Sequence, residues 1–119
     1  MQRKRTNPDF LNGVPELLIL HLLSRQPLYG YELAKEIRRS SREALDFGEG
    51  CIYPILHRLE SDGFLVSCKA LVSGRSRVVY RLTDRGAARL QESWAGWKQI
   101  VQAVHRVLQG GQRGEPAVA

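Results

Sequence analysis

Two kinds of apolar repeat follow one another along the chain. Before residue 64 and after residue 83, apolar residues recur every three or four positions, whereas between them they alternate with polar residues. The first spacing predicts helices that bury one side, and the alternation predicts strands. The sequence therefore predicts a mainly α fold with one small β-hairpin.

Two helices are predicted before the chain reaches residue 48. The first includes Pro15 at an early position, ends before Pro27 and is apolar on most of its sides. A helix of this kind in a small domain must be covered on two sides, which suggests a dimer. The second helix carries an apolar stripe and runs from about Tyr31 to Ser41.

A third helix is predicted over residues 50–63, and the rest of the chain is organised around it. Its buried stripe consists of Ile52, Ile55, Leu56 and Leu59. Its outward side carries Tyr53, Pro54, His57, Arg58 and Ser61, with Pro54 expected in the first turn. Such a side can contact a polar, anionic partner. A solvated helix side with one packed tyrosine is the alternative.

The alternating segment predicts two strands joined by a turn at residues 73–76. One face of the first strand consists of Phe64, Val66, Cys68 and Ala70, and one face of the second consists of Val78, Tyr80 and Leu82. Three helices followed by a hairpin are the order of a winged helix-turn-helix DNA-binding domain, in which the third helix reads a groove and the hairpin is the wing.

The last segment predicts a long helix that begins after Thr83, a suitable N-cap. Its apolar residues are spaced as in a heptad seam: Ala87, Leu90, Trp94, Trp97, Val101, Val104 and Leu108. We expect this helix to pair with its copy in a homodimer. The predicted organisation is a flexible basic arm (1–12), a winged helix-turn-helix (13–83), a dimerisation helix (84–109) and a disordered tail (110–119).

Charge supports a nucleic-acid partner. The chain has 119 residues and a formal net charge of +6. Charges cancel over residues 1–63, so the whole excess lies in residues 64–119, and the segment 64–83 contains four cations and no acid. We expect phosphate contacts from Lys35, Arg38, Arg39, Arg75 and Arg77, and contacts with base edges or adjacent phosphates from Tyr53, His57 and Arg58. A winged-helix protein-interaction module without a specific DNA target is the alternative, but it needs no acid-free wing.

Other function classes find little support. The three histidines are scattered over different helices, the cysteines lack metal-ligand spacing, and no nucleophile or phosphate-loop motif occurs. We therefore expect no enzyme activity, cofactor or metal. Without a membrane-spanning run or a secretory signal, a cytoplasmic protein is expected. Cys51 and Cys68 are expected to be small buried side chains, with a redox role as the alternative.

Three segments together resemble the PadR family of bacterial transcriptional regulators, specifically its short members with a single C-terminal dimerisation helix. They are LLILHLLSRQPLYGYEL (17–33), CIYPILHRLESDGFL (51–65) and GRSRVVYRLTDRG (74–86). The resemblance implies a dimer that binds an inverted-repeat operator and usually represses until an effector binds. It also implies that Tyr53 is the family's tyrosine on the reading helix and that Gly74, Arg75 and Arg77 form the wing tip.

One position departs from the family pattern. Where the family commonly has a Ser-Pro-Gly-Thr-like start of the reading helix, this chain has Gly48, Glu49, Gly50 and Cys51. The last hydroxyl is absent and an acid is added. Specificity is therefore expected to depend on Tyr53, His57 and dimer spacing.

Trp94 and Trp97 allow two interpretations. Aromatic residues at helical spacing usually fill a core. Alternatively the pair, doubled by dimer symmetry, lines an apolar slot that binds a flat aromatic small-molecule effector. The resemblance implies effector binding for a tryptophan on this helix, and Trp94 is the closer match.

Overall fold

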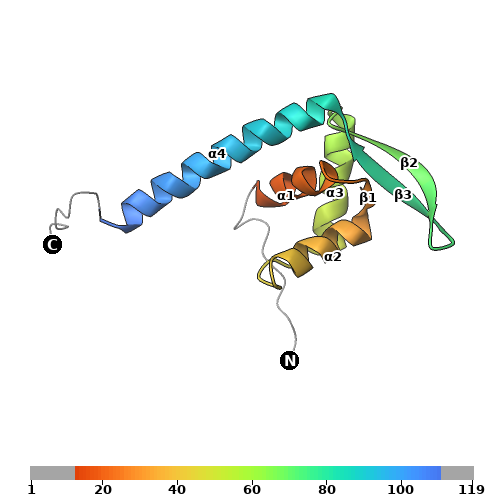
Figure 1. Ribbon diagram of the computed structural model, residues 1–119, viewed down its shortest axis with the longest axis horizontal. Helices are drawn as coiled ribbons and strands as arrows, with labels where there is room; N and C mark the ends of the chain where they lie inside the picture. The colour runs from red at the N-terminus through yellow and green to blue at the C-terminus, as the bar shows by residue number, and fades with distance from the viewer. Residues whose placement is uncertain (1–12, 111–119) are drawn as a thin grey trace.

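The computed structural model describes residues 13–110. Within them, four helices and three strands follow one another (Figure 1). Their bounds are α1 (Val14–Leu23), β1 (Leu28–Tyr29), α2 (Gly30–Ser40), α3 (Glu49–Ser61), β2 (Leu65–Val72), β3 (Arg75–Leu82) and α4 (Asp84–Leu108). This architecture confirms the predicted fold class, a winged helix-turn-helix followed by one long helix. The predicted arm and nearly all of the predicted tail lie outside the described residues.

Helix α1 is covered on most of its sides. Gly13 caps it in the left-handed conformation, with φ of 88°, and Pro15 lies in its first turn as predicted. Ile19 and Leu20 are completely buried. The helix packs against α2, α3, β3 and α4. The sequence predicted that α1 must be covered on two sides and that a second copy would cover one of them. Helix α4 of the same chain supplies part of that cover.

The sheet has the order β1-β3-β2 and is antiparallel throughout. Strand β1 was not predicted. It consists of two residues, Leu28 and Tyr29, which pair with Tyr80 and Val79 of β3. Two residues are too few to show an alternating pattern, so β1 exists because the edge of β3 offers hydrogen-bonding groups.

The hairpin turn is tighter than predicted. Val72 pairs with Arg75, so only Ser73 and Gly74 form the loop. Both have positive φ, 51° and 80°, as a two-residue type I′ turn requires. The rest of the predicted turn belongs to β3, which brings Arg75 into the strand.

The two faces of the hairpin differ in burial. Leu65 and Tyr80 are buried and Leu82 packs against the core. Near the turn, Val78 on this same face is 42% exposed because the hairpin extends beyond the helices (Figure 1). The opposite face of β2 is exposed at Val66.

The cysteines differ from each other. Cys51 is half-buried, and burial raises the pKa of its thiol. Cys68 is exposed. The prediction of a buried thiol is therefore wrong for Cys68, because the side of the strand on which it lies faces away from the core.

Helix α3 starts at Glu49, one residue before the predicted start. Gly48 is its N-cap, and a glycine offers no side chain for capping. Pro54 lies inside the helix, in its second turn, so its predicted place in the first turn is wrong. Proline has no N–H, so the carbonyl of Gly50 loses its usual helical donor.

Helix α4 begins as predicted. The Thr83 hydroxyl accepts a hydrogen bond from Gly86 N at 3.0 Å and donates one to the carbonyl of Gly63 at 2.8 Å. Leu90 is buried against the domain, but the side chains from Lys98 onward are exposed and the helix projects away from the other elements (Figure 1). Across residues 13–110, no helix combines the length and the apolar character that crossing a membrane demands.

Candidate nucleic-acid interface

The reading helix α3 presents the predicted two sides. Ile52, Leu56 and Leu59 are fully buried and Ile55 is half-buried, so the apolar stripe is confirmed. The outward residues are exposed, apart from the half-buried Tyr53: Tyr53, Pro54, His57, Arg58 and Ser61.

Tyr53 also packs the reading helix against α2. A Cβ atom added to Gly30 would lie 2.5 Å from Cζ of the Tyr53 ring, so only glycine allows this approach. The centroids of the Tyr53 and His57 rings are 6.2 Å apart. Tyr53 therefore fixes how α3 meets the start of α2 while part of its ring remains accessible beside His57.

Arg58 already has a partner within the chain. Its Nη2 lies 3.0 Å from Oε1 of Glu16 on α1. The other carboxylate oxygen of Glu16 accepts a hydrogen bond from Nε of Arg89 on α4 at 2.9 Å. The Arg58 side chain is still 50% exposed. Its predicted contact with DNA stays a prediction, and its ion pair with Glu16 is a contact that the sequence did not indicate.

The cations of α2 line its exposed side. Lys35 and Arg39 are exposed, and Arg38 is half-buried. Arg39 forms an ion pair and hydrogen bonds with Glu36, which raise the pKa of Arg39 and lower that of Glu36. Arg39 is thus partly neutralised by its own helix.

Glu49 belongs to the same surface. A shallow pocket of about 70 Å³ lies between α2 and the start of α3, lined by Tyr31, Ala34, Lys35, Arg38 and Glu49. An acidic side chain beside two cations reduces the positive potential at this end of the reading helix. Glu49 also suits the first turn of α3, whose N–H groups favour a negative charge.

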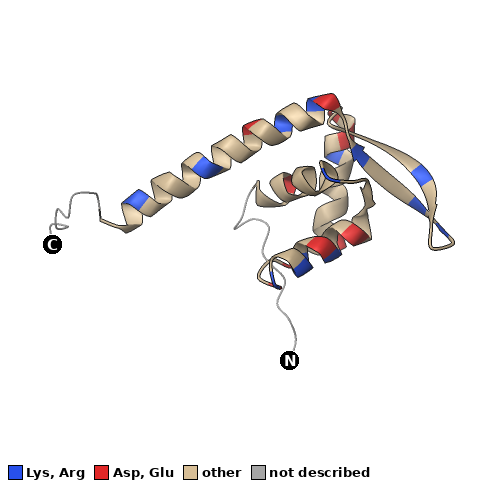
Figure 2. Ribbon diagram, in the orientation of Figure 1, with Lys and Arg blue, Asp and Glu red and all other residues tan. Residues whose placement is uncertain are grey.

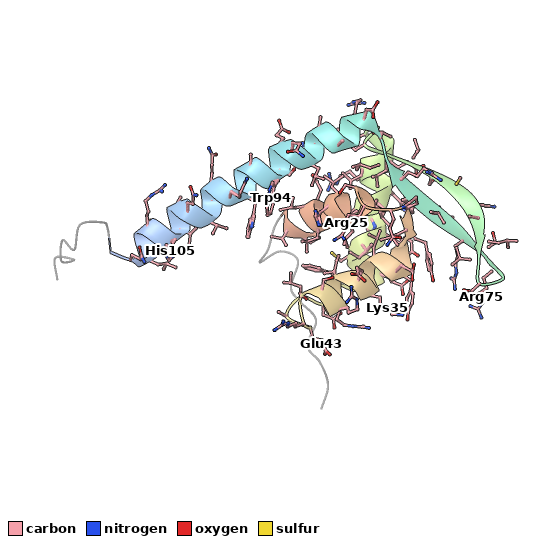
Figure 3. The ribbon with its side chains drawn as sticks, in the orientation of Figure 1. Arg25, Lys35, Glu43, Arg75, Trp94 and His105 are labelled. Atoms are coloured by element: carbon pink, nitrogen blue, oxygen red, sulfur yellow. The ribbon has the colours of Figure 1, made fainter. Side chains whose placement is uncertain are left out.

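The wing carries cations on both strands and no acid (Figure 2). The strand register places Arg75, Arg77 and Arg81 on one face of β3. Arg75 is exposed at the tip of the hairpin (Figure 3). Arg75 therefore places a positive charge beside the turn, at the end of the hairpin that lies furthest from the core.

Arg77 is held more tightly. Its guanidinium lies over the ring of Tyr29, 5.0 Å from the centroid, and Tyr29 stacks on Tyr31 with centroids 6.4 Å apart. Among the described residues, its Nε is buried without a hydrogen-bond partner. Sequence reasoning missed both tyrosines, because their proximity to Arg77 depends on the pairing of β1 with β3.

The two tryptophans line an apolar pocket between α1 and α4. The pocket has a volume of about 590 Å³ and is lined by Val14, Leu17, Leu18, His21, Ser24, Leu45, Leu90, Gln91, Trp94 and Trp97. Trp94 is 48% and Trp97 37% exposed, so neither fills the core of the protomer. Figure 3 shows Trp94 projecting from α4. His21, Ser24 and Gln91 add a few polar groups to the apolar lining.

Within residues 13–110, no group of three or more His, Cys, Asp or Glu side chains is placed to hold a metal ion. Two other features stand out among the described residues. One is the set of cations and aromatic residues on α2, α3 and the wing, and the other is the apolar pocket between α1 and α4.

Comparison with known proteins agrees with this arrangement. The profile of the transcriptional regulator PadR-like family matches residues 19–92. A transcriptional regulator of Mycobacterium tuberculosis, Rv3488, is 38% identical over 104 residues, which cover 87% of this chain and 91% of the relative.

Solved structures agree as well. A transcriptional regulator from Clostridium thermocellum superposes with a TM-score of 0.76 at 28% identity, over 82% of this chain and 96% of the other. A PadR family transcriptional regulator from Eggerthella lenta superposes with a TM-score of 0.71 at 32% identity, over 84% and 86%.

Proposed function

This chain belongs to the PadR-like family of transcriptional regulators, which are not enzymes, and we propose that it is a homodimeric repressor of an inverted-repeat operator that a small molecule releases. The observation that carries the proposal is that a hairpin with three arginines and no acidic residue packs against α3, whose outward side is exposed. Because its partner is chromosomal DNA, the proposed location is the cytoplasm.

The DNA contacts divide into two groups. Tyr53 and His57, adjacent on the outward side of α3, are the proposed contacts with base edges. Lys35, Arg38, Arg75 and Arg77 are proposed to contact phosphates, which supply affinity but little sequence choice. We give Arg39 and Arg58 a smaller share, since Glu36 and Glu16 already pair with them.

The homodimer rests on the distal half of α4. Apolar side chains of its seam and of the positions that widen the seam are exposed there: Ile100, Val101, Val104, Val107 and Leu108. A shallow apolar hollow lined by Ala103, Val104, Val107 and Leu108 lies on this side. A helix with a heptad seam, and with no element among residues 13–110 covering its distal half, suits pairing with a second copy.

Effector binding rests on the pocket between α1 and α4. It is largely apolar, has two half-exposed indole rings and includes a few polar groups, a combination that suits a flat aromatic compound with one or two hydrogen-bonding groups. Release from DNA requires that such a compound bind one dimer geometry better than the other.

The decisive experiment is an electrophoretic shift with the promoter next to the protein's own gene, at two salt concentrations. We expect a specific shift that weakens as salt rises, because phosphate contacts release counterions. Absence of a specific shift at low salt would favour the protein-interaction alternative.

The wing provides a narrower prediction. We expect Arg75→Ala to weaken binding to operator and random DNA by a similar factor and to lower the slope of log affinity against log salt by about 1 for each protomer. Arg106→Ala, which removes the same charge from an exposed position on α4, is the control and should leave the slope unchanged. A loss confined to operator DNA would contradict the phosphate role.

The pocket can be tested with anilinonaphthalene sulfonate, an aromatic dye that fluoresces strongly in apolar surroundings. We expect the protein to bind the dye and Trp94→Ala to weaken that binding by about 3- to 10-fold, the range for one lost aromatic contact. Tyr31→Ala removes an equally exposed aromatic ring outside the pocket and should have no effect. Unchanged dye affinity in Trp94→Ala would rule out the assigned site.

A further inference from the structure

We propose that Glu16 is a positioning residue that holds the reading helix α3 at a set angle to the dimerisation helix α4 and so transmits changes at the α1–α4 pocket to the DNA-binding surface. The inference rests on the function proposed above and adds the route by which that function is regulated.

The first observation is the geometry around one carboxylate. Glu16 lies on α1 and is 9% exposed. Its Oε1 accepts a hydrogen bond from Nη2 of Arg58 on α3 at 3.0 Å, and its Oε2 accepts one from Nε of Arg89 on α4 at 2.9 Å. One acid thus joins the reading helix and the dimerisation helix through charge-assisted hydrogen bonds, the stronger kind in proteins.

Arg89 is constrained on its other sides as well. Its guanidinium lies over the Phe64 ring, 5.4 Å from the centroid, and 3.7 Å from Oε1 of Glu92. The hydrogen bond that Arg89 donates to the Glu16 carboxylate raises the pKa of Arg89. Because Arg89 has little freedom to adjust, a movement of α4 at this turn must pull on Glu16 or break the contact.

The network and the pocket share the same helical turns. Leu17, next to Glu16 in the chain, lines the pocket, and so do Leu90 and Gln91, which follow Arg89. A compound that enters between α1 and α4 therefore acts on the backbone segments that carry Glu16 and Arg89. A change in their separation reaches α3 through Arg58.

Glutamate is needed here because two donors meet on one side chain. A carboxylate can accept from both arginines, whereas the amide of glutamine has a single acceptor oxygen and its NH₂ group repels a guanidinium. Glu16→Gln keeps the size of the side chain but can retain at most one of the two hydrogen bonds, the one with Arg58 or the one with Arg89.

The test uses tryptophan emission. Both tryptophans of the chain, Trp94 and Trp97, lie on α4, while the proposed DNA contacts lie on α2, α3 and the wing. Because coupling is reciprocal, binding of the promoter duplex should change the emission of these tryptophans. In Glu16→Gln we expect most of this change, measured at saturating duplex, to be lost, because the link between α3 and α4 is weakened.

Glu36→Gln is the matched control, since that carboxylate pairs only within α2 in the contacts that the structure records. It should leave the emission change as in the parent protein. If circular dichroism shows that Glu16→Gln does not fold, Arg89→Gln, which removes the α4 arm at a side chain that is 36% exposed, takes its place.

The outcomes separate the two proposals. A full emission change in folded Glu16→Gln or Arg89→Gln, or duplex binding by the parent protein without any change, overturns the role of Glu16. A parent protein that does not bind the duplex at all contradicts the proposed function instead.

Discussion

Replacing Gly86 with alanine is expected to lower the free energy of unfolding by about 3 kcal/mol, the upper range for a forced atom in a packed site. A Cβ at this position would lie 2.1 Å from the carbonyl oxygen of Phe64 and 2.7 Å from Cδ1 of Leu82. The carbonyl belongs to the backbone and cannot rotate away, so the start of α4 must move. Thermal unfolding should record a midpoint about 12 °C lower, at roughly 4 °C per kcal/mol for a chain of this length.

Gly50→Ala is the matched control. This glycine is also in a helix, but a Cβ there would have no atom within 4 Å. It should be neutral or slightly stabilising, because alanine is the better helix former. Both variants must be compared at one protein concentration, since dimerisation adds to the midpoint. Equal midpoints for the two variants would show that the contact at Gly86 relaxes freely.

Replacing Val104 with glutamate is expected to convert the proposed dimer to a monomer and to weaken operator binding by about 100-fold or more, the loss when two linked half-sites bind separately. Val104 lies on the apolar seam and is 51% exposed in the protomer. Pairing would bury the new carboxylate without a partner, which is costly. Sedimentation and electrophoretic shifts measure the two effects.

Gln99→Glu introduces the same charge on the side of α4 opposite the seam and should leave the protein dimeric. A Val104→Glu protein that remains dimeric would show that another surface forms the dimer. A monomer with undiminished operator affinity would remove the role of dimer spacing in recognition.

Most elements of the fold could be predicted because their signals are local. The stripe of Ile52, Leu56 and Leu59, the Thr83 cap and the hairpin turn, which was predicted two residues too long, each depend on residues a few positions apart. The errors were local as well. Helix α3 starts one residue earlier than predicted, which places Pro54 in its second turn. Cys68, which was expected to be buried, lies on the exposed face of its strand.

The sequence predicted which residues belong to the candidate site. It did not predict most of the contacts that these residues make. The pattern marked Tyr53, His57 and the wing arginines as outward residues. In the structure His57 and Arg75 are exposed, whereas Tyr53 and Arg77 are half-buried. The pattern did not show that Tyr53 packs on Gly30, that Arg77 stacks on Tyr29 or that Arg39 pairs with Glu36. These contacts decide which cations already have a partner within the chain and which are available for the proposed contacts with phosphate.

The sequence by itself determined the order of the four helices and the hairpin, the family and the separation of a balanced N-terminal half from a cationic C-terminal half, because periodicity, motifs and charge are properties of the linear chain. Only the tertiary structure decided that strand β1 exists, that Trp94 and Trp97 line a pocket against α1, and that Glu16 joins α3 to α4. Glu16 is 42 residues from Arg58 and 73 from Arg89. Contacts over such separations arise from packing, which no local pattern encodes.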